Sequence, residues 1–359
     1  MAAVRYEVPN PSAWLHRFAV FAAICVFPLI FIGGLVTSKG AGLAVPDWPN
    51  TYGYNMFLFP PSMWVGNILY EHTHRLFASF VGLLTTILAV WLWWKEPRRW
   101  VRWLGVIAFV VVLFQGILGG LRVVLLKDEI GIFHACLAQA FFCLMVAIAF
   151  FTSRWWKQQS TEPDARAGTL RWACLLVTGV VFLQLALGAT MRHSHAGLAI
   201  PDFPLAYGQL VPLTDPAALE KINTTRHAVL QLEPVTASQV WIHFSHRLGA
   251  VLVTAAIVWL ATIVFRRFRE QQGLVGLAVA LVFLLGLQIF LGAWTVLSQK
   301  AADVATAHVA VGALVLAGCF SMTLLAFKLF RPVPVLAATP STVLDPAPPT
   351  LPEQSSVLS

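Results

Sequence analysis

The chain contains few charged residues. Only 11% of its 359 residues are Asp, Glu, Lys or Arg, whereas 58% are hydrophobic, and the mean hydropathy is +0.75. This composition is too apolar for a soluble domain of this length, and it is typical of chains that cross a bilayer. We therefore exclude a soluble fold and predict an integral membrane protein.

Cysteine is absent outside the apolar segments. The five cysteines all fall inside predicted spans: Cys25, Cys136, Cys143, Cys174 and Cys319. A thiol inside a span acts as a small packing residue, so the sequence predicts no disulfide.

Two other features are missing. Residues 1–16 lack the short apolar core and small-residue cleavage site of a secretory signal. No nucleic-acid-binding module occurs, so we attribute the net charge of +8 to basic cytoplasmic segments and their contact with anionic lipid.

Apolar segments of about 20 residues or more occur eight times and predict eight transmembrane helices. They lie near residues 17–37, 64–94, 103–126, 131–153, 172–191, 237–265, 273–297 and 304–328. Basic pairs such as Arg98-Arg99 and Arg266-Arg267 lie in alternate connections, and basic residues are retained on the cytoplasmic side. We expect cytoplasmic termini and a bacterial inner (cytoplasmic) membrane as the location.

The sequence contains an internal repeat. Gly42-Leu-Ala-Val-Pro-Asp-Trp-Pro49 recurs as Gly197-Leu-Ala-Ile-Pro-Asp-Phe-Pro204, at an offset of 155 residues. Downstream, His74 matches His246 at an offset of 172 and His134 matches His308 at 174. The increase indicates an insertion of about 17 residues in the second long loop, around residues 212–234.

Each repeat contains four spans, and an even number of crossings makes the copies parallel repeats about an axis along the membrane normal. We predict an all-α integral membrane fold of two parallel-repeat four-helix bundles, with cofactor sites between facing helices. The predicted parts are a cytoplasmic N-terminus (1–16), an N-terminal bundle (17–153), a cytoplasmic linker (154–171), a C-terminal bundle (172–328) and a disordered cytoplasmic tail (329–359).

Four histidines lie at matched depths in the outer halves of alternate spans. His74 and His134 belong to the first repeat, and His246 and His308 to the second. A single histidine in a span is most often a packed, hydrogen-bonded residue, but ionisable groups there are costly and commonly functional. Their paired recurrence favours metal or haem ligation.

Haem fits this pattern better than a bare metal ion. Two imidazoles facing each other fill both axial positions of a porphyrin iron, whereas zinc or copper needs further donors, and no carboxylate or thiol recurs in both halves. Small residues would let a flat ligand approach the backbone, although helix packing explains them equally well. They are Gly116, Gly119, Gly120, Gly292 and Ala293.

Three arginines lie near the outer ends of the spans. Arg75 and Arg247 directly follow two of the histidines, where a guanidinium pairs with haem propionates or extends to water. Arg122 has Thr295 as its counterpart, which predicts an extra cation at the first site.

Other polar residues receive structural interpretations. Gln115 and Gln288 recur as buried amides, and we expect them to make structural hydrogen bonds. We interpret His72 as interfacial, and His193 and His195 as surface residues of the second long loop.

Glu71 marks the main difference between the repeats. It lies three residues before His74 on one helical face, whereas its counterpart is His243. A carboxyl group in an apolar haem pocket suits proton transfer, and the alternative is an interfacial Glu paired with a nearby Arg. The replacement predicts proton-coupled chemistry in the first half only.

Together, the paired loops and the histidine motifs resemble the haem A synthase family over roughly residues 15–328. The motifs are Glu71-His72-Thr73-His74-Arg75, Ser245-His246-Arg247, His134 and His308. The family oxidises the C8 methyl group of haem O to a formyl group, which yields haem A for cytochrome c oxidase.

The resemblance implies roles for individual residues. His74 and His134 would hold haem O as substrate and haem A as product, with Glu71 as the catalytic residue. His246 and His308 would ligate a resident haem b in the C-terminal half that carries electrons. Many family members also have a cysteine pair in an outer loop, which this chain lacks.

Two other functions are compatible with parts of the pattern. A membrane electron-transfer protein with two bis-histidine haems explains the histidines but leaves Glu71 without a role. A parallel-repeat transporter would place its site at the midplane rather than near the outer surface. As partners we expect haem O, membrane lipid, haem O synthase and cytochrome c oxidase assembly factors, with a homo-oligomer also compatible and nucleic acid excluded.

Overall fold

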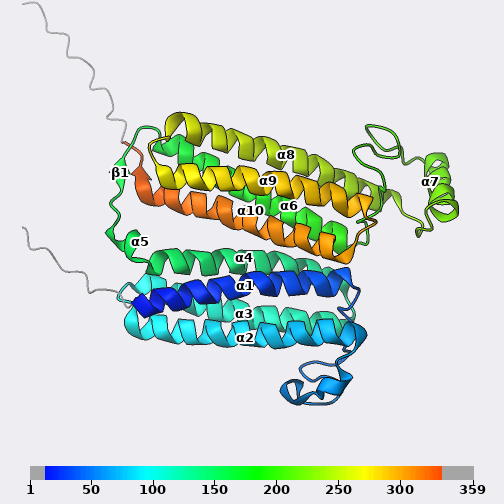
Figure 1. The fold of residues 1–359 in the computed structure, drawn as a ribbon, viewed down its shortest axis with the longest axis horizontal. Coiled ribbons are helices and arrows are strands. Elements are labelled where there is room, and N and C mark those ends of the chain that lie inside the picture. The colour runs from blue at the N-terminus through cyan, green and yellow to red at the C-terminus, as the bar shows by residue number, and fades with distance from the viewer. Residues whose placement is uncertain (1–12, 334–359) are drawn as a thin grey trace, which may run out of the picture.

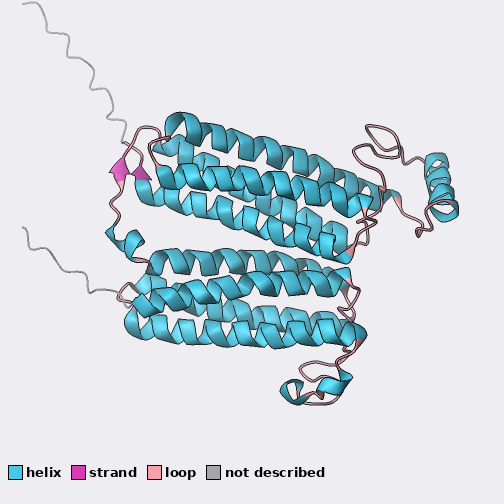
Figure 2. Cartoon of the chain, in the orientation of Figure 1, coloured by secondary structure: helices cyan, strands magenta, loops and turns pink. Residues whose placement is uncertain are grey.

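The computed structural model describes residues 13–333 and consists mainly of helices (Figures 1 and 2). Eight helices are long and apolar enough to cross a membrane, which confirms the all-α membrane fold and the eight predicted spans. They are α1 (Ala13–Ser38), α2 (Gly66–Lys95), α3 (Arg99–Leu125), α4 (Asp128–Thr152), α6 (Ala167–His193), α8 (Ala237–Arg267), α9 (Gln272–Leu297) and α10 (Ala302–Leu329).

The connections contain short elements. These are η1 (Met56–Leu58), η2 (Pro61–Met63), α5 (Arg154–Gln158), α7 (Pro216–Ala228), β1 (Glu162–Pro163) and β2 (Phe330–Arg331). β1 and β2 pair in parallel and join the linker between the halves to the end of α10. The predicted disordered tail therefore begins with a paired strand, and its residues 334–359 lie outside the described residues.

The spanning helices form two sets of four (Figure 1). In the first set α1 and α3 each contact both α2 and α4, and in the second α6 and α9 each contact both α8 and α10. The sets meet along α1, α4, α6 and α10. As a result, 61% of the most apolar window of α10 is buried, compared with 17% in α3, which leaves most of α3 to face lipid. The parallel symmetry axis stays a prediction.

The two ends of the bundles differ. We call the end with residues 39–65 and 194–236 the long-loop end, and the opposite one the basic end (Figure 1). At the basic end, Glu96 is 1% exposed and accepts hydrogen bonds from Arg98 Nε (2.7 Å) and Lys157 Nζ (3.2 Å). Burial alone would raise the pKa of Glu96, but these cations outweigh it and lower the pKa.

Each set has an apolar core, and both cores lie in the half of the bundle nearer the basic end. The first includes residues 15–30 of α1 and 81–92 of α2. The second includes residues 167–181 of α6 and 253–264 of α8. The four histidines all belong to the other half of the bundles, where these apolar cores do not extend.

Candidate functional site

Each predicted ligand histidine lies against a glycine of a neighbouring helix. A Cβ atom added at Gly33 of α1 would lie 3.0 Å from Nε2 of His74 on α2. One added at Gly119 of α3 would lie 3.5 Å from Cε1 of His134 on α4. Because glycine has no side chain, each imidazole has room to pack against the backbone of the neighbouring helix.

The second half repeats this arrangement. Added Cβ atoms at Gly188 and Gly292 would each lie 3.0 Å from Cε1 of His246 and His308, respectively. Gly33 and Gly188 are equivalent in the internal repeat, as are Gly119 and Gly292. Among the five small residues that the sequence singled out, Gly119 and Gly292 therefore contact the histidines.

Within each half, the two histidines lie close enough to interact electrostatically. His134 lies within electrostatic range of His74, and His308 within range of His246. All four histidines are half-buried residues within the helical bundles. The structure thus brings together the two predicted pairs, one in each half.

Two of the ring nitrogens are available as metal ligands. Nδ1 of His134 and Nδ1 of His308 are buried without a hydrogen-bond partner among the described residues. A neutral imidazole nitrogen is the donor that haem iron accepts. In residues 13–333 no group of three or more His, Cys, Asp or Glu could hold a metal ion, so the donor set is two imidazoles in each half. The residues present therefore fit a bis-histidine haem.

Buried amides support the histidines. Gln115 Nε2 donates to the His134 backbone oxygen (3.1 Å), and Gln288 Nε2 lies 3.5 Å from His308 Nε2. These contacts agree with the structural interpretation of both glutamines. Gln184 was missed by the sequence reasoning because it has no counterpart in the first repeat, and its Nε2 lies 3.2 Å from His246 Nδ1.

Glu71 and His243 hold the duplicated loops in the same way. The Glu71 side chain is 4% exposed and accepts the Val45 backbone N–H (2.8 Å). His243 is 3% exposed, and its Nδ1 accepts the Ile200 backbone N–H (3.2 Å). Val45 and Ile200 both precede the first proline of the repeated motif. The same hydrogen bond therefore occurs in both halves, but its acceptor is a carboxylate in the first half and an imidazole in the second.

Arg75 and Arg247 bind backbone carbonyls of these loops. Arg75 donates through Nη1 and Nη2 to the carbonyls of Val45, Asp47 and Asn50, at 2.7–3.0 Å. Its Nη2 also pairs with Glu71 Oε1 at 2.7 Å. Glu71 is thus ion-paired with an arginine, as in the alternative interpretation, but it is buried rather than interfacial, and its catalytic role stays a prediction.

Arg247 makes the corresponding bonds in the second half. It donates to the carbonyls of Ile200, Asp202 and Leu205, each 155 residues beyond its counterpart in the first loop. The repeated loops are therefore held by repeated contacts, and only the Nε–H groups of the two arginines make no hydrogen bond within the described chain.

A Tyr-Gly pair extends the repeat beyond the motif that the sequence analysis used. Asp47 accepts the backbone N–H groups of Tyr52 (2.8 Å) and Gly53 (2.7 Å), and Asp202 does the same for Tyr207 and Gly208. Partial burial raises the pKa of Asp47, but these bonds and nearby Arg75 outweigh it, so the pKa lies below its usual value. The offset of 155 could have revealed this pair.

Arg122 and Lys300 occupy equivalent places in the two halves. A Cβ atom on Gly42 would lie 2.7 Å from Arg122 Nη1, and one on Gly197 would lie 3.4 Å from Lys300 Cδ. The glycines are equivalent in the repeat, but the cations are not. Lys300 approaches from the connection between α9 and α10, so a lysine side chain lies near this place in the second half, and the role of Arg122 as an extra cation at the first site stays a prediction.

Comparison with known proteins shows the family of the chain. Residues 16–320 match the family model of the cytochrome oxidase assembly protein family, COX15-CtaA. The chain belongs to this family.

Curated relatives share most of its length. Heme A synthase of Geobacillus kaustophilus is 27% identical over 92% of this chain and 98% of the relative. Heme A synthase of Shouchella clausii is 28% identical over 75% of this chain and 87% of its own length. Heme A synthase of Sphingopyxis alaskensis is 26% identical over 86% of this chain and 90% of its own length.

Two histidines differ from their predicted placement. His72 is completely buried rather than interfacial, with its ring 4.7 Å from Trp64 and 5.0 Å from Phe59. His193 ends α6 and its ring packs against Gly131 of α4 rather than facing solvent. These side chains are covered by the first long loop and by the facing half, neither of which is visible in the local sequence. His195 is a surface residue, as expected, with 76% of its side chain exposed.

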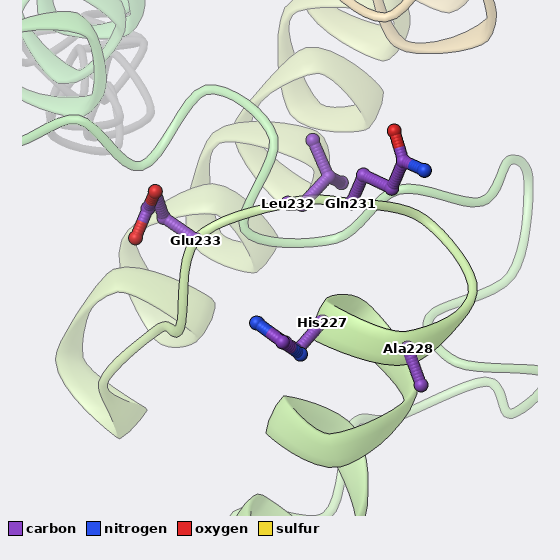
Figure 3. Close-up of a pocket in the computed structure, with 5 residues that line it drawn as sticks. All are labelled: His227, Ala228, Gln231, Leu232 and Glu233. Carbon is purple, nitrogen blue, oxygen red and sulfur yellow. The ribbon is translucent and has the colours of Figure 1, made fainter.

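A surface cavity of about 470 Å³ lies beside α7 and is lined by none of the four candidate ligand histidines (Figure 3). It is lined by His227, Ala228, Gln231, Leu232 and Glu233. These residues belong to the inserted part of the second long loop and have no equivalent in the first half. We therefore assign the cavity no part in the candidate site.

Proposed function

We propose that this protein is a haem A synthase, which oxidises the C8 methyl group of haem O to the formyl group of haem A. The observation that carries the proposal is the set of four histidines, each seated against a glycine in the half of a bundle without an apolar core. Family membership and the printed names of the relatives support it. The same names do not favour an electron-transfer protein without substrate oxidation.

His74 and His134 would hold the substrate, and His246 and His308 a resident haem b. Haem b would supply one-electron redox chemistry. Both halves offer the same donor set, so the division of roles rests on Glu71, which only the first half has.

We assign Glu71 to proton transfer during the oxidation. Its carboxylate lies one helical turn from His74 and is almost completely buried, which keeps competing water away. It also holds Val45 and Arg75, so taking up a proton would weaken the hold on the first loop. Arg75 and Arg247 then act mainly as loop anchors, and their Nε–H groups and Arg122 are the donors left for propionates.

The same proposal covers location and partners. The chain would lie in a bacterial inner membrane with cytoplasmic termini, because the basic end carries the ion-paired Arg98 and Lys157. A haem O synthase and assembly factors of cytochrome c oxidase are the expected partners, and a homo-oligomer is compatible with the lipid-facing helices.

The test is production of the full chain in cells that supply haem O, followed by pigment extraction and chromatography. We expect haem A and a hydroxymethyl precursor with the native chain, and neither with His74→Ala. His227→Ala is the matched control, because its exposed side chain lies in the inserted part of the second long loop, at the cavity to which we assign no part in the site. If the native chain forms neither product, the proposal is wrong.

A further inference from the structure

Three cations gather where the two halves meet at the long-loop end. Arg192, near the end of α6, donates through Nη2 to the Gly34 carbonyl oxygen and to Ser38 Oγ on α1, both at 2.5 Å. It therefore reaches from the second half into the first. Its position in the first repeat is taken by Thr37, so the sequence repeat gave no signal for it.

Arg122 reaches the same junction from the first half. Its Nη2 lies 3.4 Å from Asp128 Oδ1, and His195 Nε2 lies 3.3 Å from Asp128 Oδ2. His193, next to Arg192 in sequence, packs against Gly131 one turn after Asp128. The end of α6 thus lies on the start of α4, which brings Arg192 and Arg122 together.

Lys300 completes the group. It follows α9, and the pKa of its amine is lowered first by partial desolvation and then by the nearby positive charge of Arg192. Neither Lys300 nor Arg192 forms an ion pair with any residue in the described chain.

The charges of this junction do not balance. Arg122, Arg192 and Lys300 carry three positive charges, and Asp128 is the only carboxylate that pairs with any of them among the described residues. Charged groups at such depths pair with an opposite charge or with backbone carbonyls, so this excess of positive charge favours an added anion. In addition, Arg122 Nε is buried and has no hydrogen-bond partner in residues 13–333.

The junction lies between the two histidine pairs. Arg122 is within electrostatic range of His74 and His134, and Arg192 within range of His308. A group seated on those histidines would therefore have this junction within reach of an anionic substituent. Haem carries its two propionates on one edge of the ring, which suits a cation cluster beside each ring.

We propose that Arg122, Arg192 and Lys300 form one carboxylate-binding site, shared by both halves, which takes propionate groups from the tetrapyrroles of the two histidine pairs. The proposal rests on the proposed function, since it requires haem in the bundles. It assigns Arg192 a role in positioning both rings, with their carboxylate edges turned toward each other.

The test compares haem b with its dimethyl ester, which lacks the carboxylate charges, as ligands of the full chain produced without haem. Absorbance titration gives both affinities. We expect the native chain to prefer haem b by roughly tenfold or more, because charge-assisted hydrogen bonds are lost in the ester. Arg192→Gln and Lys300→Gln should each reduce this preference severalfold, and Arg192→Lys should retain most of it.

The matched control is Lys39→Gln, which should keep the native preference. Lys39 is an exposed cation at the same end, but it lies over the Tyr70 ring at 5.9 Å instead of in the cluster. If Arg192→Gln does not fold, Lys300→Gln gives the same information, because the Lys300 side chain makes no hydrogen bond in the described chain.

The outcomes separate the two proposals. A native chain that binds haem b and the ester equally overturns the shared carboxylate site and leaves the proposed function standing. The same holds if both Gln variants keep the native preference. A native chain that binds neither ligand overturns both proposals.

Discussion

At the scale of single residues, Glu71 combines two tasks that can be separated. Its carboxylate accepts the Val45 N–H and pairs with Arg75, and His243 accepts the equivalent N–H in the second half. A role in holding the loop needs only a hydrogen-bond acceptor, whereas proton transfer needs an ionisable group. The residue difference between the repeats therefore has a direct test.

We predict that Glu71→Gln lowers the rate of haem A formation by about 10²-fold or more, because the amide keeps an acceptor oxygen but takes up no proton. The control is His243→Gln, which should stay near the native rate. Product chromatography over time measures both. A native rate in Glu71→Gln would show that the carboxylate only holds the loop.

The contacts between glycines and the candidate ligand histidines lead to a second prediction. An added methyl group at Gly33 would lie 3.0 Å from His74 Nε2 and would have to displace the ring, whereas at Gly119 the closest approach to His134 is an ordinary 3.5 Å. Overpacking of this kind costs about 1–3 kcal/mol, while Ala raises helix propensity by about 1 kcal/mol at either site.

Gly33→Ala should therefore weaken haem binding at the first site and alter its low-spin spectrum, and Gly119→Ala should leave both unchanged. Electron paramagnetic resonance and haem content of the purified variants check this. Equal effects of the two variants would mean that the glycines serve helix packing alone.

At the scale of elements, the first long loop is a folded unit with its own hydrogen bonds. Asp47 binds the N–H groups of Tyr52 and Gly53, and Arg75 binds three of its carbonyls. Because the pKa of Asp47 is depressed in the folded loop, its stabilisation is complete above the ordinary Asp pKa of about 3.9 and is lost as pH falls through the folded pKa.

We therefore expect amide protection at Tyr52 and Gly53 to be constant near neutral pH and to fall in acid. Asp47→Asn should reduce it at least about tenfold near neutral pH, since hydrogen bonds to a charged group contribute about 1.5–3 kcal/mol each. Hydrogen exchange, corrected for intrinsic rates, measures this. The amides of Tyr207 and Gly208, which Asp202 binds, are the internal control, and unchanged protection at Tyr52 would contradict the prediction.

At the scale of the whole molecule, the two halves offer the same donors but are expected to hold different groups. We predict that His308→Ala removes the resident haem, because the partner His246 alone leaves an axial position open. His134→Ala, the equivalent change in the first half, should retain resident haem and lose product formation. Haem content per chain in cells without haem O measures the difference, and loss of resident haem in His134→Ala instead would reverse the assignment of the halves.

Much of the fold followed from the sequence. Length and hydropathy alone predicted the eight helices. The offset between repeated motifs showed that His74 is equivalent to His246 and His134 to His308. The contacts of His72 and His193 could not be predicted, because the groups that cover them come from a loop and from the facing half. The placement of Lys300 was also hidden, since a cation can enter the same space from a different position in sequence.

The sequence by itself determined that the chain lies in a membrane, how many spans it has and at what depth the histidines lie. These properties depend on local composition and on helical rise. Only the tertiary structure decided what surrounds them. It placed a glycine against each histidine, turned Arg75 and Arg247 toward loop carbonyls, and brought Arg122, Arg192 and Lys300 to one junction. Such contacts join segments far apart in the chain, and their partners are fixed by packing of helices rather than by any local pattern.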